Sequence, residues 1–497
     1  MKKMLVRLLC IAVATALLAG LFTGCSAGKV DTSKEVELVM YLLGDAPKDQ
    51  DMVMAEFNKM VKKDLNATLK LNHTGWADFQ AKYKLILSSG EKCDLIFAAP
   101  WCDYFSLAAK GAFMPLDDLL PKYAPTLWEK QNKADFEDGK VKGKYYLIPT
   151  NFTEFSTNSM LIRGDLRQKY GLEKIKDRKG LEAFLDAVKN GEKDMIPFNM
   201  SGTEAEHIWL LEAEQHWENL ADGFLSVDMD DKGKLFCKYE TPEFEAFCKD
   251  MKTWCDKGFW SKSILSNKIH SRDAFKNGKS AVANANNMMA KQFGETVSPD
   301  WKFESFDRAV VSGYCSVNPY INNSLAIPKN SKNPERALML VDKIKYNRDY
   351  FDMLFYGIKG KHYDLTADGK LTLPAGLKAE DNGYPPDSIG SWPLRTNEFY
   401  RASANEWPGF AEANKYFETI KITNYPAIFN PNKDEVLTEL AALSQLTSQY
   451  INPLLYGIGD IDQGIKDLKA KLKAAGIDKV KDVYQKQWNE FKKAKGF

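Results

Sequence analysis

Aromatic side chains gather in segments where the sequence predicts loops. Trp76, Trp101 and Tyr104 occur in two such segments, and Asp103 stands between the last two. Aromatic rings stack on flat C–H faces such as those of sugars, while carboxylate and amide groups form directional hydrogen bonds to hydroxyl groups. These residue types predict noncovalent binding of a saccharide. Peptides and other polar solutes use similar surfaces, and packing inside the protein is the alternative for each ring.

A second group of candidates lies later in the chain. Asn286 and Asn287, with Asn284 before them, follow or end a predicted buried strand, where turn chemistry is the alternative role. Trp209 lies in a predicted helix among apolar neighbours, which favours core packing. Residues 361–408 are rich in Gly, Pro, Tyr and Trp, as long loops over binding sites often are. This segment supplies the candidates Tyr384, Trp392, Arg395, Asn397 and Trp407.

Alternating strands and helices must position the first group. Strands are predicted over residues 36–43, 67–72 and 94–98, and helices over residues 51–63, 78–89 and 103–110. This order predicts parallel strands with helices packed on both faces of the sheet. Ligands of such sheets bind beyond the carboxyl ends of the strands, where the three aromatic candidates would lie. Further on, the sequence predicts a hairpin over 224–239 and helices over 434–450, 461–475 and 480–493.

Signatures of catalysis and metal binding are missing from the sequence. Its G-x-S-x-G pattern, at residues 24–28, falls across the end of the predicted export signal, and the sequence contains no phosphate-binding loop, no HExxH and no CxxC pair. We therefore expect no catalytic residue, no metal and no cofactor. A glycoside hydrolase would need two facing carboxylates, for which Glu154 and Asp103 can be nominated, but 67 acidic residues make any such pair easy to find.

The N-terminus has the pattern of an export signal. Three basic residues precede an apolar run over residues 8–22 that is too short to span a membrane. The run ends just before Cys25, and this arrangement resembles bacterial lipoprotein signals, in which residues 1–24 are removed and the cysteine is lipidated. Residues 25–35 would then be a lipidated tether. An ordinary secretory signal with an incidental cysteine is the alternative.

Composition and length limit the remaining possibilities. The formal net charge is +1, and loss of the three basic signal residues leaves −2, which does not indicate a nucleic-acid partner. A chain of 497 residues exceeds what one hydrophobic core usually supports, so two lobes are expected. An exported protein can form disulfides but a large one does not need them. Disulfide status therefore stays open for Cys93, Cys102, Cys237, Cys248, Cys255 and Cys315.

Several landmarks, in their order and spacing, carry a resemblance to a known family. Besides the export signal and the early alternation, they are Asp94-Leu95-Ile96 and the segments 111–119, 143–149, 275–283 and 326–337. The chain resembles an extracellular solute-binding protein of a bacterial ABC importer of the carbohydrate-uptake type. The segments 333–337, 356–363 and 473–477 resemble a lipoprotein subgroup with an extra C-terminal region.

The resemblance implies an α/β, periplasmic-binding-protein-like fold of two lobes. Each lobe would hold a mostly parallel sheet flanked by helices, and about three crossing strands would form a hinge. The N-terminal lobe would comprise residues 36–149 and 272–325, and the C-terminal lobe residues 150–271 and 326–497.

The same resemblance implies a function. A monomer that is not an enzyme, anchored at the outer face of the cell membrane, would capture an oligosaccharide in an interlobe cleft and deliver it to permease subunits. A receptor that reports a ligand to a membrane sensor is one alternative, and a secreted carbohydrate-active enzyme is another.

Overall fold

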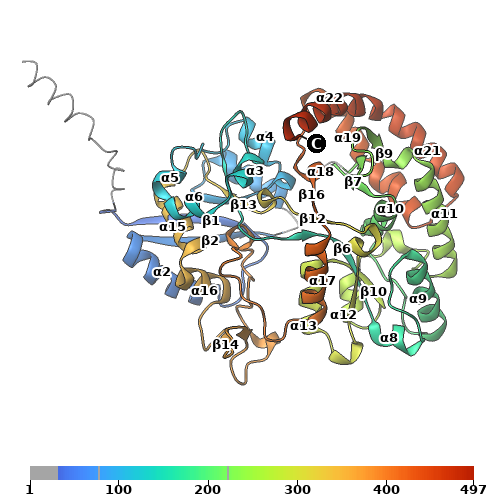
Figure 1. Cartoon of the computed structure of the whole chain (residues 1–497), viewed down its shortest axis with the longest axis horizontal. Coiled ribbons are helices and arrows are strands. Elements are labelled where there is room, and N and C mark those ends of the chain that lie inside the picture. Colours follow the sequence, from blue (N-terminus) through green and yellow to red (C-terminus); the bar gives the residue numbers. More distant parts are fainter. Residues whose placement is uncertain (1–31, 76–78, 221–222, 497) are drawn as a thin grey trace, which may run out of the picture. The chain divides into compact units, whose positions relative to one another are not determined.

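The structure, a computed structural model, describes residues 32–75, 79–220 and 223–496 (Figure 1). The predicted signal, Cys25, most of the tether and Trp76 lie outside the described residues. The chain divides into two compact units. Unit 1 contains the described residues up to Asn151 together with Asn323–Tyr363 and Asp381–Phe399; unit 2 contains Phe152–Asn322, Asp364–Glu380 and the residues from Tyr400 onward.

This division differs from the predicted boundaries, and strand pairing explains the difference. Strand β10 (Val282–Asn286) pairs with β6 (Asn158–Ile162), which places residues 272–322 in unit 2. Strand β13 (Ser324–Ala326) pairs with β3 (Leu95–Ala98), which places the following chain in unit 1. The chain passes from one unit to the other after Asn151, Asn322, Tyr363, Glu380 and Phe399, more often than the resemblance implied.

Unit 1 is built on a five-stranded sheet in the order β2-β1-β3-β13-β4. Strands β1 (Val36–Leu43) and β2 (Ala67–Thr74) are parallel, and β3 is parallel to β1, as the alternating sequence pattern predicted. Strand β13 is antiparallel to both β3 and β4 (Leu147–Pro149). Strands β1 to β4 therefore all end at one edge of the sheet, which we call the carboxyl edge.

The helices of unit 1 follow from apolar residues at helical spacing. Helix α2 (Gln50–Leu65) buries one such stripe, and its Phe57 meets Tyr350 edge to face. Helices α15 (Pro334–Tyr346) and α16 (Arg348–Tyr356) pack against α2. The shorter helices are α3 (Phe79–Ser89), α4 (Tyr104–Ala109), α5 (Leu120–Tyr123), α6 (Pro125–Lys130) and α7 (Lys133–Glu137).

Unit 2 is α/β but its sheets are mostly antiparallel, so the predicted parallel sheet is wrong for this unit. One sheet has β6 between β10 and β11 (Glu304–Asp307), antiparallel to both. A second sheet joins β7 (Trp217–Asn219), β8 (Leu225–Asp228) and β9 (Leu235–Cys237) by antiparallel pairs, which confirms the predicted hairpin. In the third, β12 (Cys315–Val317) is parallel to β16 (Lys421–Thr423) and antiparallel to β5 (Phe155–Ser156).

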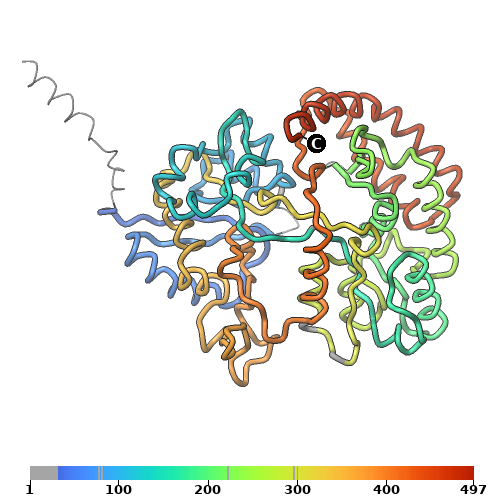
Figure 2. Tube along the Cα trace, in the orientation of Figure 1, coloured from blue at the N-terminus to red at the C-terminus, as the bar shows by residue number. Residues whose placement is uncertain are grey.

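The C-terminal region completes the core of unit 2. Helices α9 (Arg178–Gly191), α10 (Trp209–Glu214) and α11 (Pro242–Lys257) share one hydrophobic cluster with the C-terminal helices. The latter are α19 (Leu437–Ser444), α21 (Ile461–Ala474) and α22 (Ile477–Lys495), drawn in red beside green segments of the same unit (Figure 2). Tyr484 and Trp488 of α22 are fully buried there. The C-terminal region is therefore part of this core and not a separate module.

The remaining helices of unit 2 are α8 (Gly164–Lys169), α12 (Ser271–Lys276), α13 (Asn287–Thr296), α14 (Arg308–Ser312), α17 (Pro408–Thr419), α18 (Tyr425–Ile428) and α20 (Asn452–Leu455). Among the described residues, no helix combines the length and the apolar character needed to cross a membrane.

The cysteines of the described chain are buried free thiols. They are Cys93, Cys102, Cys237, Cys248, Cys255 and Cys315. Burial raises the pKa of Cys102 to about 12, so its reactive thiolate is scarce at neutral pH. For protein that begins at Ser26, we expect dithiothreitol to change the melting temperature by less than about 1 °C, because no disulfide constrains the unfolded chain. Differential scanning calorimetry with and without reductant checks this, and a fall of several degrees would contradict it.

Candidate functional site

One segment of unit 1, residues 387–397, crosses the carboxyl edge of the sheet; we call it the strap. It meets the strands in the order in which they lie in the sheet. At the end of β2, His73 Nε2 donates to Ile389 O at 3.1 Å. At the end of β1, Gly390 lies against Leu43, and a Cβ added to this glycine would lie 2.2 Å from the Leu43 carbonyl oxygen. Such a close approach requires glycine at this position.

The strap continues over the other strands. The ring of Trp392 lies 6.1 Å, centroid to centroid, from Phe97 of β3, and the 3-10 turn η8 (Trp392–Leu394) contacts β13. Beyond the end of β4, Thr150 Oγ1 donates to Trp392 O at 3.2 Å. Asn151 N donates to Arg395 O, and Asn397 N donates to Asn151 O at 2.8 Å. Side-chain bonds from His73 and Thr150 and backbone bonds to Asn151 together hold the strap at both ends of the edge.

An ion pair closes the strap on itself. Asp387 Oδ2 accepts a hydrogen bond from Arg395 Nε at 2.7 Å, and Asp387 Oδ1 accepts one from Ser391 Oγ at 2.7 Å. Arg395 is only 7% exposed. Its guanidinium therefore holds the strap in shape, which corrects its prediction as a ligand contact.

Two partly exposed indoles rest on one buried ring at the carboxyl edge; we call Trp101 and Trp392, with the buried Phe97 beneath them, the aromatic platform. Trp101 lies on the 3-10 turn η1 (Pro100–Cys102) directly after β3, and 39% of it is exposed. Its ring packs at 5.3 Å on Phe97 and at 6.0 Å on Phe79. Trp392 is half-buried on the same Phe97. The platform thus offers an exposed indole held in place by neighbouring rings, at the edge where the sequence predicted a ligand.

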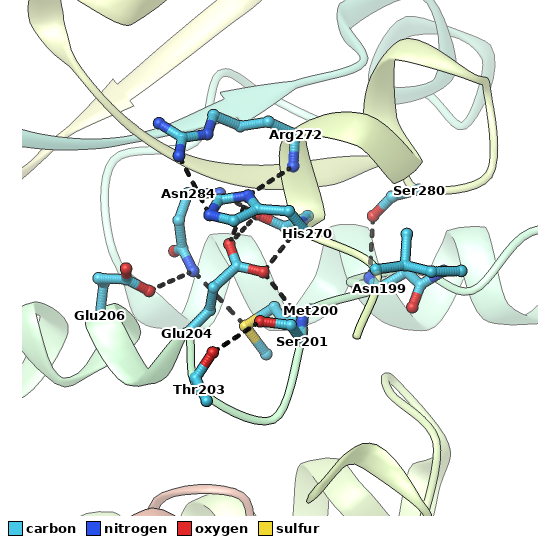
Figure 3. A network of polar contacts seen from close by, with 12 residues as sticks. Asn199, Met200, Ser201, Thr203, Glu204, Glu206, His270, Arg272, Ser280 and Asn284 are labelled. Carbon is cyan, nitrogen blue, oxygen red and sulfur yellow. Dashed lines mark hydrogen bonds and ion pairs between the residues drawn. The ribbon is translucent and has the colours of Figure 1, made fainter. Parts of the chain in front are cut away.

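Unit 2 contains a second candidate surface, a polar network centred on Glu204 (Figure 3). This carboxylate is 2% exposed. One oxygen accepts hydrogen bonds from Ser201 N at 2.9 Å and Ser271 N at 2.7 Å. The other accepts from Ser271 Oγ at 2.6 Å and lies 3.1 Å from His270 Nδ1. Because its lone pairs are used, Glu204 organises its neighbours and has little left to offer a ligand.

One outer member of the network, Glu206, does have capacity for a ligand. Asn284 Nδ2 donates to Glu206 Oε2 at 3.2 Å. Asn284 is 5% exposed, and in the described part of the chain its Oδ1 has no hydrogen-bond partner. Because this oxygen is itself buried, a ligand cannot reach it, and the role of Asn284 is to hold the carboxylate of Glu206. Glu206 is exposed, so its carboxylate can accept further hydroxyl donors.

Arg272 and His270 border these side chains. Arg272 Nη2 lies 3.0 Å from His270 Nε2. Partial burial lowers the pKa of His270, against the opposing effect of Glu204. A neutral imidazole accepts from Arg272 through Nε2 and carries its proton on Nδ1, toward Glu204. Among the described residues, no cluster of His, Cys, Asp or Glu is placed to hold a metal ion.

The loop of the network also contains a fully buried histidine. His207 Nε2 donates to Leu455 O at 2.8 Å, and burial lowers the pKa of this imidazole to about 4. Unfolded, it would titrate near 6.5. Between these values the unfolded chain binds the proton and the folded protein does not. We expect the free energy of unfolding to fall by up to about 1.4 kcal/mol per pH unit as pH drops from about 6.5 to about 4.

Urea unfolding of the wild type and of His207→Gln at pH 7, 6 and 5 measures this effect. Glutamine can still donate to Leu455 O but does not titrate, so the difference between the two proteins isolates His207. A difference that is constant across this pH range would contradict the assignment.

Three of the predicted ligand contacts are core residues. Tyr104 is fully buried and its hydroxyl donates to Gly139 O at 2.6 Å. Tyr384 is also fully buried, and its hydroxyl donates to Leu354 O at 2.8 Å. Trp209 is buried in the core of unit 2. The structure thus corrects these three predictions, because the rings fill hydrophobic space and the hydroxyls satisfy backbone carbonyls.

The other predicted residues have varied surroundings. Asn287 is buried and bonds Asn414, which corrects its prediction, whereas the exposed Asn286 caps helix α13 through a 2.9 Å bond to Met289 N. Asp103 is exposed and forms an ion pair with Lys84 at 3.0 Å. The roles of Trp101, Asp103, Trp392, Asn286 and Asn397 in ligand binding remain predictions.

Two parts of the site were missed by sequence reasoning. The strap could not be predicted, because its contacts are with residues distant in sequence. Its apolar residues also do not recur at the spacing of a helix or a strand. Glu204 did have a signal: Ser201 to Glu204 follows the S-x-x-E pattern of a capping box, in which the glutamate accepts from the backbone N–H of the serine.

Comparison with known proteins identifies the class. A family model described as bacterial extracellular solute-binding protein matches residues 45–344, and the chain belongs to this family. A second model, described as a domain of unknown function, DUF3502, matches residues 427–493. The two-lobe α/β fold expected from the sequence is the fold of this class.

Particular relatives are similar over almost the whole chain. A carbohydrate ABC transporter substrate-binding protein of Streptococcus pneumoniae is 26% identical over 503 residues, covering 98% of this chain and 97% of the relative. The crystal structure of the N-glycan transport solute binding protein NgtS from Streptococcus pneumoniae has a TM-score of 0.75 at 23% identity, covering 93% of this chain and 100% of that one. An extracellular solute-binding protein from Bifidobacterium longum subsp. infantis has a TM-score of 0.67 at 17% identity, covering 92% and 98%.

Proposed function

We propose that this solute-binding protein captures an oligosaccharide and delivers it to an ABC importer. The observation that carries the proposal is the aromatic platform at the carboxyl edge of unit 1, with the exposed ring of Trp101 supported by Phe97. Sugar rings stack on such surfaces through their C–H faces. Because Trp101 and Trp392 flank the same Phe97, the platform supplies two stacking positions, which favours a ligand of more than one sugar ring.

Unit 2, taken by itself, carries in its polar network the other kind of group that binds saccharides. The exposed carboxylate of Glu206, held by Asn284 Nδ2, is a hydrogen-bond acceptor, and sugar hydroxyls are donors. Structures of similar proteins support a glycan ligand: NgtS has been solved with Man5GlcNAc, and the Streptococcus pneumoniae protein FusA with kestose. The ligand class proposed for this chain rests on the platform and is supported by these relatives.

The proposal includes the place of action. An extracytoplasmic location follows from the family. We propose that the signal in residues 1–24 is removed, that Cys25 is lipidated at the outer face of the cell membrane, and that the monomer passes its ligand unaltered to permease subunits. Mass spectrometry of the N-terminal peptide from the membrane fraction should then show a lipid on Cys25 and no residues 1–24, whereas a peptide with an unmodified Cys25 would contradict lipid anchoring.

Thermal unfolding against a ligand panel tests the function. Protein beginning at Ser26 is heated with Man5GlcNAc, kestose and maltoheptaose, and with monosaccharides and tripeptides as controls. A ligand at about 100 times its dissociation constant stabilises the folded state by about 2.7 kcal/mol, which raises the melting temperature by on the order of a few degrees.

The outcomes separate the alternatives. A selective shift by one oligosaccharide series, with the sugar recovered intact, supports the proposal. A shift by peptides alone overturns the saccharide class, chemical conversion of the sugar overturns the binding-only function, and a panel without any shift contradicts the proposal.

A further inference from the structure

The C-terminal region holds both ends of the loop that bears the polar network. We call residues 201–207 the network loop and residues 454–457 the C-terminal turn. At one end of the loop, the Tyr456 hydroxyl donates to Ser201 O at 3.0 Å. At the other end, His207 Nε2 donates to Leu455 O at 2.8 Å. The turn lies in the segment matched by the domain of unknown function.

These contacts are rigid because they are buried and tightly packed. Tyr456 and His207 are fully buried, and their ring centroids lie 5.5 Å apart. Trp260 Nε1 donates to Tyr456 O at 2.9 Å, which fixes the turn from another side. Gly457 has a φ of +65°, and a Cβ there would lie 2.4 Å from the backbone of Lys252. The turn is thus seated on helix α11 without room to shift.

A continuous chain of hydrogen bonds leads from the turn to the ligand acceptor. Ser201 accepts from Tyr456 through its carbonyl and donates its N–H to Glu204 at 2.9 Å. Glu204 accepts from Ser271 Oγ at 2.6 Å, and the same Oγ accepts from Asn284 N at 3.1 Å. Asn284 in turn donates to Glu206, which the network loop itself carries. The Glu206 carboxylate, which is proposed to bind sugar, is therefore positioned both by the network loop that carries it and by Asn284, which the same network holds.

We propose that the C-terminal turn is a positioning element for Glu206 and Asn284, so that the C-terminal region of unknown function is part of the binding machinery of unit 2. This inference rests on the proposed function for the identity of the ligand. Tyr456 is a positioning residue: it contacts the loop and not the acceptor. If the turn only filled the core, loss of its hydroxyl would lower stability and leave the loop and the affinity unchanged.

Tyr456→Phe tests the inference, with Tyr104→Phe as a matched control. Both tyrosines are fully buried and each loses one hydroxyl–carbonyl hydrogen bond, but Tyr104 lies in unit 1. Amide hydrogen exchange at 25 °C should be about fivefold faster for a peptide over residues 199–208 in Tyr456→Phe, as expected for loss of one hydrogen bond that limits local opening. It should be unchanged in Tyr104→Phe. A peptide from α11 serves as the reference for global unfolding.

The affinity for sugar is the second measurement, because it would not change if Tyr456 only stabilised the core. Isothermal titration with Man5GlcNAc and with kestose, far below the melting temperature, should show about fivefold weaker binding for Tyr456→Phe and wild-type binding for Tyr104→Phe. Unchanged exchange over residues 199–208, or unchanged affinity beside faster exchange, overturns the inference. If neither sugar binds the wild type, the proposed function fails for these probes, and the exchange result alone decides whether the turn positions the loop.

Discussion

Replacing Trp101 with alanine should weaken oligosaccharide binding by about 30-fold, which corresponds to about 2 kcal/mol of lost stacking and apolar burial. The indole is 39% exposed and rests on Phe97 and Phe79, so it can cover a sugar face without rearrangement. The same exposure means that truncation leaves the core of unit 1 intact. Isothermal titration at 25 °C with the saccharide that raises the melting temperature measures the effect.

Trp128→Ala is the matched control for this variant. Trp128 is also a partly buried tryptophan of unit 1, but it packs on Phe136 and Tyr145 and belongs neither to the platform nor to the strap. Its loss should leave the affinity unchanged. If Trp101→Ala binds the saccharide as tightly as Trp128→Ala does, the platform is not the sugar-binding surface.

Gly390→Ala should destabilise the protein by about 3–5 kcal/mol, a size that is exceptional for one added methyl group. The glycine has a φ of +67°, and its Cβ would lie 2.2 Å from Leu43 O, a backbone atom that the β1–β2 pairing holds in place. To relieve this clash, either the strap moves away from the carboxyl edge or strand β1 shifts. Because the strap carries Trp392, we also expect the affinity for oligosaccharide to fall by at least about tenfold. Urea unfolding and titration calorimetry measure the two effects.

Gly360→Ala is the control that separates the steric clash at Gly390 from the free-energy cost of placing alanine at a positive φ. Gly360 lies in unit 1 and has a φ of +79°, but a Cβ there meets nothing within 4 Å. It should cost only the roughly 1–2 kcal/mol of the left-handed conformation and leave affinity unchanged. Equal losses for the two variants would mean that the contact between strap and strand does not matter.

Local sequence patterns predicted the helices and strands whose formation depends on neighbouring residues. The alternation over residues 36–110 predicted β1 to β3 with their helices, because apolar spacing decides which face of an element is buried. The boundaries of the units were wrong because they depend on pairings such as β10 with β6, between strands more than a hundred residues apart. The strap is the extreme case: His73 and Ile389 are 316 positions apart.

For the candidate site, the position of a residue at the end of a strand was easier to predict than the burial of its side chain. Pro100 and the end of a buried strand placed Trp101 on a strand-end loop, where the structure has it. Tyr104, only three residues later, looks alike in sequence, yet its hydroxyl reaches Gly139 O and the ring is buried. A tyrosine in the core and a tyrosine that contacts a ligand can have the same kinds of residues beside them in the sequence. What separates them is which distant carbonyl lies within reach, and that is a property of the tertiary fold.

The discontinuity of both units decides how early in synthesis each can finish folding. The sheet of unit 1 lacks β13 until residue 326 is available, and its strap is complete only at Asn397. The core of unit 2 includes side chains as late as Trp488. A ribosome makes the N-terminus first, so neither unit can close while most of the chain is still unmade. The protein should therefore cross the membrane as an unfinished chain whose apolar surfaces need shielding, and its yield on export should depend on chaperones that hold long unfolded segments.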